Sequence, residues 1–256
     1  MLAILSPAKS LDETPVSAGI RRSGIAFESD TRQLLKTLKR LRPADLKALM
    51  GVSDKLADLN HTRHQAIELP LPAESIPAAL LFAADVYRGL DARSLDAESL
   101  EWASEHVAIL SGLYGLLRPL DAVAPYRLEM GTKLKTRRGA NLYAFWGTRL
   151  AKRIDTQLAG HADRVVVDLA SKEYASAVPR KAVKADWLTV QFKEIRDGKP
   201  RIISFFAKYA RGLMARYLVE HRIEHREAIK GFDREGYAFS PDLSSESTFV
   251  FTRASK

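Results

Sequence analysis

The 256-residue sequence contains no cysteine, which excludes disulfides, thiolate metal ligands and cysteine nucleophiles. It also lacks any apolar run near the roughly 18 residues that a membrane span needs. The apolar stretch at the N-terminus is too short for a signal peptide, because Pro7 and Lys9 follow it at once. We therefore expect a cytoplasmic protein that does not act on a membrane.

The common nucleotide and hydrolase fingerprints are missing as well, since there is no P-loop, no GxGxxG and no GxSxG. Among the six histidines, only His61 with His64 and His221 with His225 have ligand-like spacing, and both pairs lie in polar, surface-like sequence. We therefore expect neither a catalytic metal nor a cofactor.

Positive charge is concentrated in one part of the chain. The formal net charge is +9, yet residues 131–230 alone carry 22 Lys/Arg against 10 Asp/Glu, a net charge of +12. Residues 1–130 have a net charge of −2, and the residues from 231 onward have a net charge of −1. A surface biased in this way attracts polyanions, and nucleic acid is the first candidate.

Strand and helix patterns alternate along the chain. Apolar runs predict buried strands at 2–5, 107–113 and 165–169, a hairpin of 185–195 with 200–206 around Asp197-Gly198, and final short strands at 236–239 and 248–252. Helices are expected at 30–41 (capped by Asp30), 43–50, 53–65, 96–105, 141–158 and 208–222, whereas 78–89 fits either helix or strand. This order predicts a mixed α/β (α+β) fold: a single domain over residues 1–256, with a mixed sheet and surrounding helices.

Polar side chains follow three of the predicted strands. Ser6, Lys9 and Asp12 follow the first strand, and Ser111 and Ser171 follow two others. Such positions commonly line a crevice at the carboxyl edge of a sheet, so we expect one polar pocket that also includes Glu173 and Tyr174. The serines are equally suited to cap the following helices, and this is the favoured interpretation for Ser171.

The segment 110–135 mixes charged and aliphatic residues without a steady period. Its polar and aromatic members are Ser111, Tyr114, Arg118, Asp121, Tyr126, Arg127 and Glu129. Because buried charge is costly unless it is paired, this pattern predicts a functional site. The alternative is a loop held by structural ion pairs.

Lys208 and Arg211 are three residues apart, so they share one face of the predicted helix near its start. The helix dipole disfavours cations there, which predicts an anionic partner: a phosphate, Glu129 or Glu173. The alternative is a solvated helix edge.

A helical subregion at about 28–66 contains a turn that resembles a helix-hairpin-helix. Gly51 and Val52 would form the turn, Ser53 the cap, and Lys55 the basic partner of a phosphate. Ser53 stands where the motif usually has a second glycine, and Asp54 adds negative charge. An ordinary helical hairpin fits the spacing equally well.

Several segments together resemble the YaaA family of bacterial proteins. The matching stretches are LSPAKSLD (5–12), SDKLADLN (53–60), DVYRGL (85–90), LSGLYGLLRPLDAVAPYRLEMGTKL (110–134), NLYAFWG (141–147), LASKEY (169–174) and ISFFAKYARGLMARY (203–217). The resemblance implies a compact mixed α/β unit with a positively charged cleft and a helix-hairpin-helix-like element. It also implies a role in surviving hydrogen peroxide by limiting iron-driven damage, with binding of double-stranded DNA and no established catalytic activity.

The leading hypothesis is a monomeric, cytosolic protein of the peroxide response that binds double-stranded DNA with low sequence specificity. The predicted phosphate-binding residues are Gly51, Val52, Ser53, Lys55, Arg118, Arg127, Lys208 and Arg211, and the predicted pocket residues are Ser6, Lys9, Ser111, Tyr114, Tyr126 and Ser171. The alternative is an enzyme that acts on a nucleotide or nucleic acid in the same pocket, because a phosphate binder has little use for acidic groups. Its candidate catalytic residues are Lys9, Asp12, Glu129, Glu173 and Tyr174.

Overall fold

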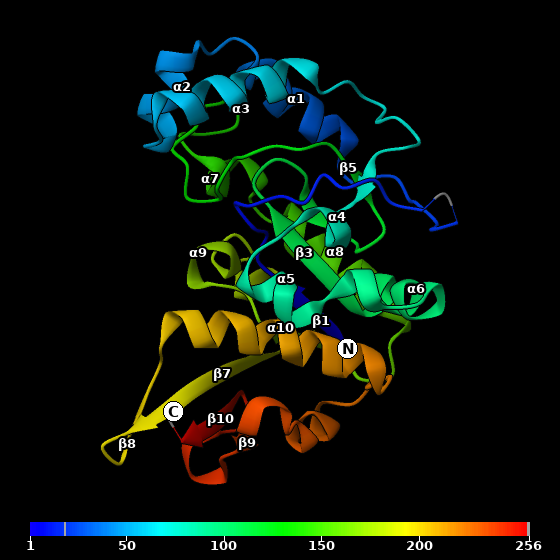
Figure 1. Ribbon diagram of the computed structural model, residues 1–256, viewed down its shortest axis with the longest axis vertical. Helices are drawn as coiled ribbons and strands as arrows, with labels where there is room; N and C mark the ends of the chain where they lie inside the picture. Colours follow the sequence, from blue (N-terminus) through cyan, green and yellow to red (C-terminus); the bar gives the residue numbers. More distant parts are fainter. Residues whose placement is uncertain (18, 255–256) are drawn as a thin grey trace.

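A mixed sheet forms the centre of the computed structural model, which describes residues 1–17 and 19–254 (Figure 1). Its strand order is β4-β3-β1-β6-β7-β10-β9, and β8 pairs with β7. The strands are β1 (Leu2–Leu5), β3 (Val107–Ser111), β4 (Gly115–Leu117), β6 (Val165–Asp168), β7 (Asp186–Arg196), β8 (Lys199–Arg201), β9 (Ala238–Phe239) and β10 (Thr248–Ala254). Strands β3, β1, β6, β7 and β10 run parallel, whereas β4, β8 and β9 pair antiparallel. The predicted mixed sheet is confirmed.

Helices surround this sheet, and a second small sheet pairs β2 (Ile76–Pro77) with β5 (Ala122–Val123). The helices are α1 (Glu28–Leu38), α2 (Pro43–Met50), α3 (Asp54–Ala66), α4 (Ala78–Leu81), α5 (Asp85–Leu90), α6 (Ala97–His106), α7 (Leu142–Trp146), α8 (Arg149–Gln157), α9 (Lys172–Ala175) and α10 (Ser204–Glu220). Figure 1 shows α1, α2 and α3 grouped at one end of the molecule, away from β7 to β10. Within the described residues, no helix is both long and apolar enough to cross a membrane.

Parallel pairing brings three strand ends to one edge of the sheet. Ile4 of β1 lies opposite Ala108 of β3 and Asp168 of β6, so these strands end side by side. All residues of the three strands are buried, as expected for parallel strands covered on both faces. The chain leaves β1 toward β3 and later returns on the other side as β6. This reversal creates the crevice in which α/β sheets commonly bind ligands.

Three sequence predictions are wrong in detail, and one open alternative is resolved. A continuous helix over 141–158 is broken at Gly147, whose φ of 53° and ψ of −122° suit only glycine, into α7 and α8. Helix α10 begins at Ser204, so residues 204–206 are helical and the hairpin strand β8 ends at Arg201. Helix α1 begins at Glu28, and Asp30 pairs with Arg138 and Arg149 instead of capping it. Residues 78–89, which fitted either state, form the short helices α4 and α5.

Helices α5 and α10 pack backbone against backbone at two glycines. A Cβ atom on Gly212 would lie 1.8 Å from the carbonyl oxygen of Val86, and one on Gly89 would lie 2.3 Å from that of Tyr209. Such distances leave no room for a methyl group. The contact therefore fixes where α10 lies relative to α5.

We expect Gly212→Ala to lower the free energy of unfolding by about 3 kcal/mol, because the helices must separate to admit the methyl group. Urea denaturation measures this change. Gly160→Ala is the matched control, since a Cβ atom there would have no neighbour within 4 Å. Equal stability of the two variants would contradict the proposed backbone contact.

The α2–α3 hairpin has the predicted turn. Gly51 ends α2 with a φ of 61°, and the Ser53 side chain caps α3 by accepting a hydrogen bond from the backbone N–H of Leu56. Lys47 pairs with Asp54 across the turn at 2.9 Å. These contacts describe a helical hairpin, and its binding of phosphate stays a prediction.

His64 attaches α3 to the core. Its side chain is fully buried, and neither ring nitrogen makes a hydrogen bond of good geometry to the described residues. Burial lowers the pKa of His64 to about 4, and the backbone of Arg127 only partly offsets the effect. The ring is therefore neutral near pH 7.

Because the unfolded chain binds this proton near pH 6.5 and the folded chain only near pH 4, stability falls as the pH falls through this range. The loss assigned to His64 is roughly 3 kcal/mol. We expect His64→Leu to flatten the stability–pH curve, although half-buried His106, whose pKa is also about 4, retains part of the slope. Exposed His225→Gln serves as the control and should leave the curve unchanged. An unaltered curve in His64→Leu would refute the assignment.

Candidate functional site

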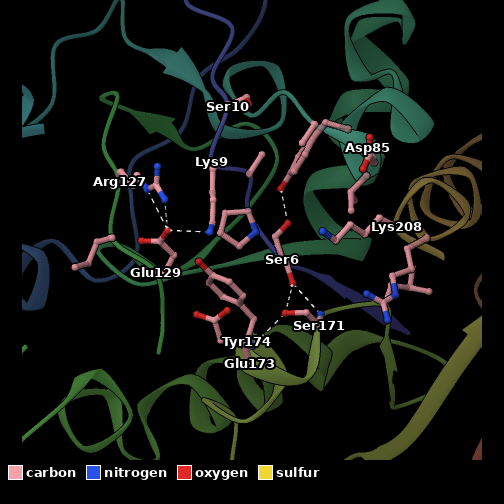
Figure 2. Close-up of a pocket in the computed structure, with 18 of the residues that line it drawn as sticks. Ser6, Lys9, Ser10, Asp85, Arg127, Glu129, Ser171, Glu173, Tyr174 and Lys208 are labelled. Carbon is pink, nitrogen blue, oxygen red and sulfur yellow. Dashed lines mark hydrogen bonds and ion pairs between the residues drawn. The ribbon is translucent and has the colours of Figure 1, made fainter. Parts of the chain in front are cut away.

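A cavity of about 360 Å³ lies at the carboxyl ends of β1 and β6 (Figure 2). Segments that are distant in sequence form its wall: the turn after β1, α5, residues 126–129, α9 and α10. The predicted residues that line it are Ser6, Lys9, Tyr126, Arg127, Glu129, Ser171, Glu173, Tyr174, Lys208 and Arg211. The structure brings this set together at the strand ends, and the roles of these residues stay predictions.

Two serines join the strand ends at the middle of the cavity. The Ser6 hydroxyl donates to Ser171 Oγ at 3.2 Å and accepts from the Ser171 backbone N–H at 2.8 Å. The Tyr87 hydroxyl donates to the Ser6 carbonyl oxygen at 3.0 Å. Ser171 also caps α9 by accepting from the Tyr174 backbone N–H, so the favoured capping interpretation of Ser171 is confirmed. This network fixes the turn after β1 against α9 and α5.

An ion cluster occupies one end of the cavity. Glu129 Oε1 accepts from Arg127 Nε at 3.0 Å and Nη2 at 2.9 Å, and Lys9 Nζ lies 3.3 Å away. Burial alone would raise the pKa of Glu129, but the hydrogen bonds and charge of Arg127, helped by Lys9, outweigh it and lower the pKa. Glu129 is therefore ionised at neutral pH, and its charge is already matched by both cations.

The opposite end carries cations that lack such a partner. In Figure 2, Lys208 points toward Ser6 from the side of the cavity opposite Arg127 and Glu129. Among the described residues, no carboxylate oxygen lies within 4.0 Å of the side-chain nitrogens of Lys208 or Arg211. Burial lowers the pKa of Arg211, and Asp168 opposes this only from beyond ion-pair distance.

This arrangement decides between the predicted anionic partners of Lys208 and Arg211. Glu129 is bound by Arg127 and Lys9, and Glu173 Oε1 accepts from the Gly131 backbone N–H at 2.8 Å. Neither carboxylate reaches the two cations of α10. Glu129 and Glu173 are therefore not the partners, and phosphate stays a prediction beside the alternative of a solvated helix edge, since Lys208 is exposed.

The tyrosines of the cavity are buried and stay protonated. Burial is the main cause that raises the pKa of Tyr87, Tyr126 and Tyr174 well above the ordinary value. The Tyr126 hydroxyl lies 2.6 Å from Ser111 Oγ, which also accepts from the Tyr114 backbone N–H. Ser111 and Tyr114 therefore support Tyr126 from within the core, and their predicted place in the cavity lining is wrong.

Other predicted residues lie elsewhere. Asp12 pairs with Arg93 at 2.9 Å, outside the cavity lining. Arg118 pairs with buried Asp121 at 3.1 Å, as the structural ion-pair alternative predicts, and lines a different hollow. The hairpin residues Gly51, Val52, Ser53 and Lys55 do not line the strand-end cavity either. A single hollow that unites all the predicted phosphate-binding residues is therefore not formed.

Two lining residues, Asp85 and Tyr87, were not predicted as part of the site, although both lie in the family-like stretch DVYRGL (85–90), because the pattern of 78–89 fits helix and strand alike. The nearest hint is Gly89, whose close contact with α10 places α5 at the cavity. As for metals, no group of three or more His, Asp or Glu side chains suited to hold an ion occurs within residues 1–17 and 19–254.

Comparison with known proteins places the chain in a family. The model of the family described as "Peroxide stress protein YaaA" matches residues 1–243. A UPF0246 protein of Caulobacter vibrioides (strain NA1000 / CB15N) is 50% identical over 253 residues, covering 99% of each chain. UPF0246 proteins of Phenylobacterium zucineum and Paracidovorax citrulli are 49% and 50% identical over 255 residues, covering 99% of this chain and 95% and 98% of theirs. The chain therefore belongs to the YaaA family of peroxide stress proteins.

Proposed function

We propose that the protein binds the phosphate backbone of double-stranded DNA during the response to hydrogen peroxide, and so limits iron-driven damage in the cytoplasm. The name of the family supports the role in peroxide stress. The observation that carries the DNA proposal is the pair of cations on α10, Lys208 and Arg211, which face a cavity without a carboxylate partner from the described residues. Cations that face a cavity without a carboxylate partner favour a phosphate ligand.

Further exposed cations lie outside the cavity lining. They include Lys133, Lys135, Lys172, Lys181 and Lys199, all from the basic region 131–230. Lys172 is the first residue of α9, next to Ser171 and Glu173 of the cavity. Contacts between lysine and phosphate position DNA but carry no sequence information, which supports binding of low specificity.

Binding that neutralises several phosphates weakens steeply with salt. We expect log affinity to fall linearly with log salt, with a slope of about −0.9 for each phosphate neutralised. Lys208→Ala should weaken binding and bring the slope closer to zero by about 1. Fluorescence anisotropy with a labelled duplex, read over a series of salt concentrations, measures both quantities.

Arg164→Ala is the matched control. Arg164 is exposed and directly precedes β6, so it lies at the amino edge of the sheet, opposite the cavity. A slope near zero for the unmodified protein would rule out the phosphate mechanism. Equal losses in Lys208→Ala and Arg164→Ala would show that the cavity is not where DNA binds.

The same variants link binding to protection. In a strain that lacks the gene, we expect the unmodified protein and Arg164→Ala to restore survival in hydrogen peroxide, and Lys208→Ala to restore it poorly. Colony counts after a peroxide pulse measure the effect. Full protection by a Lys208→Ala protein that no longer binds DNA would separate DNA binding from the peroxide role.

A second candidate is an enzyme that acts on a nucleotide or nucleic acid in this cavity. The observation that favours it is the ionised Glu129 held beside Lys9, since backbone binding alone requires no acidic group. Mass spectrometry of oligonucleotides and mononucleotides after incubation with the protein tests it. Unchanged masses of every substrate would remove this candidate.

A further inference from the structure

We propose that the cavity receives one nucleotide unit, with the phosphate bound by Lys208 and Arg211 and the base directed toward Lys9 and Glu129. This inference rests on the proposed function, since it takes the nucleotide to come from bound DNA. It goes further in naming the part of the ligand that enters the cavity and the direction in which that part lies.

The size of the cavity suits one nucleotide and is too small for a base-paired duplex. Pockets of roughly 300 to 1,000 Å³ hold drug-sized molecules, and the volume here is about 360 Å³. A mononucleotide belongs to that size class, whereas a base-paired duplex is far too wide to enter. DNA therefore reaches the cavity only through a nucleotide that has left the stack or lies at an end.

The charges of the cavity give the nucleotide a direction. Figure 2 shows Lys208 on one side, Ser6 and Ser171 in the middle, and Lys9 with Glu129 on the other side. The phosphate belongs beside Lys208 and Arg211, because the cations at the other end, Lys9 and Arg127, already pair with Glu129. The serine hydroxyls then lie level with the sugar.

The end of the cavity at Lys9 and Glu129 has the hydrogen-bond donor and acceptor that the edge of a base requires. Lys9 donates, and its side chain is 67% exposed, while the Glu129 carboxylate accepts. Tyr126, Leu128 and Tyr174 line the cavity and are buried, and the two phenols are neutral. Aromatic and apolar walls of this kind hold any base by its face, which suits a protein that does not read sequence.

An exposed ring one helical turn before Lys208 favours a nucleotide that is part of a polymer. Phe205 is 55% exposed and precedes Lys208 by three residues on α10. Arg88 lies 5.8 Å from the centre of the Phe205 ring and pairs with Asp85 of the cavity. An exposed ring beside arginine and lysine suits stacking on a neighbouring base of the strand.

Three labelled duplexes of equal length test the inference with the full-length protein. The first duplex is fully paired. The second carries a single unpaired nucleotide, and the third carries an abasic nucleotide at the same position. We expect the unpaired nucleotide to raise affinity roughly tenfold over the paired duplex, the effect of one added charged hydrogen bond. Fluorescence anisotropy at constant salt measures all three affinities.

Two variants separate the ends of the cavity. Lys208→Ala should remove the gain for both the unpaired nucleotide and the base-free position, because both contain the phosphate. Lys9→Ala should reduce the gain for the unpaired nucleotide only. Both side chains are exposed, so neither change threatens folding. Arg164→Ala should preserve all three affinities.

The outcomes distinguish this inference from the DNA proposal. Salt-dependent binding with equal affinity for all three duplexes overturns the inference and leaves the DNA proposal standing. A preference that survives both Lys208→Ala and Lys9→Ala also overturns it. If thymidine 5′-monophosphate binds in calorimetry and none of the three duplexes binds, the cavity takes a free nucleotide, and both the DNA proposal and the inference from it are overturned. Absence of binding to every probe overturns both.

Discussion

Parallel pairing of β1 with β3 and β6 is the constraint on which the site depends. β3 and β6 each lie more than a hundred residues from β1 in sequence, yet the carboxyl ends of all three meet at one edge, where Ser6 and Ser171 bond to each other. The remaining wall is added by helices. Gly89 and Gly212 allow α5 and α10 to touch through their backbones, and this contact carries Tyr87 and the cations of α10 to the same edge.

The electrostatic asymmetry of the cavity follows from this construction. Arg127 and Glu129 are two residues apart on one segment, so they pair locally, and Lys9 joins them from the turn after β1. Lys208 and Arg211 project from a helix whose described neighbours bring no carboxylate within ion-pair distance. Lys208 is exposed, but Arg211 is partly buried, and a partly buried cation without a partner carries a cost that an anionic ligand would offset.

Local chemistry explains which parts of this arrangement could be predicted from the sequence. Ser6 and Ser171 were predictable because polar residues that follow parallel strands share an edge, and Ser53 and Asp96 because caps are encoded within one turn. The break at Gly147 was not, since the apolar pattern of α7 continues into α8 and hides the backbone reversal. Asp12 was misplaced because its partner, Arg93, is distant in sequence. The position of α5 could not be predicted, because Gly89 is explained only by the contact of α5 with Gly212 of α10.

The central claim is that the strand-end cavity is where a phosphate-bearing ligand binds. A crystal structure of the full-length protein with a short duplex that contains one unpaired nucleotide tests it most directly. The account predicts that nucleotide inside the cavity, with its phosphate within hydrogen-bond distance of Lys208 and its base beside Lys9. DNA bound on another face, with the cavity holding only water, would contradict it.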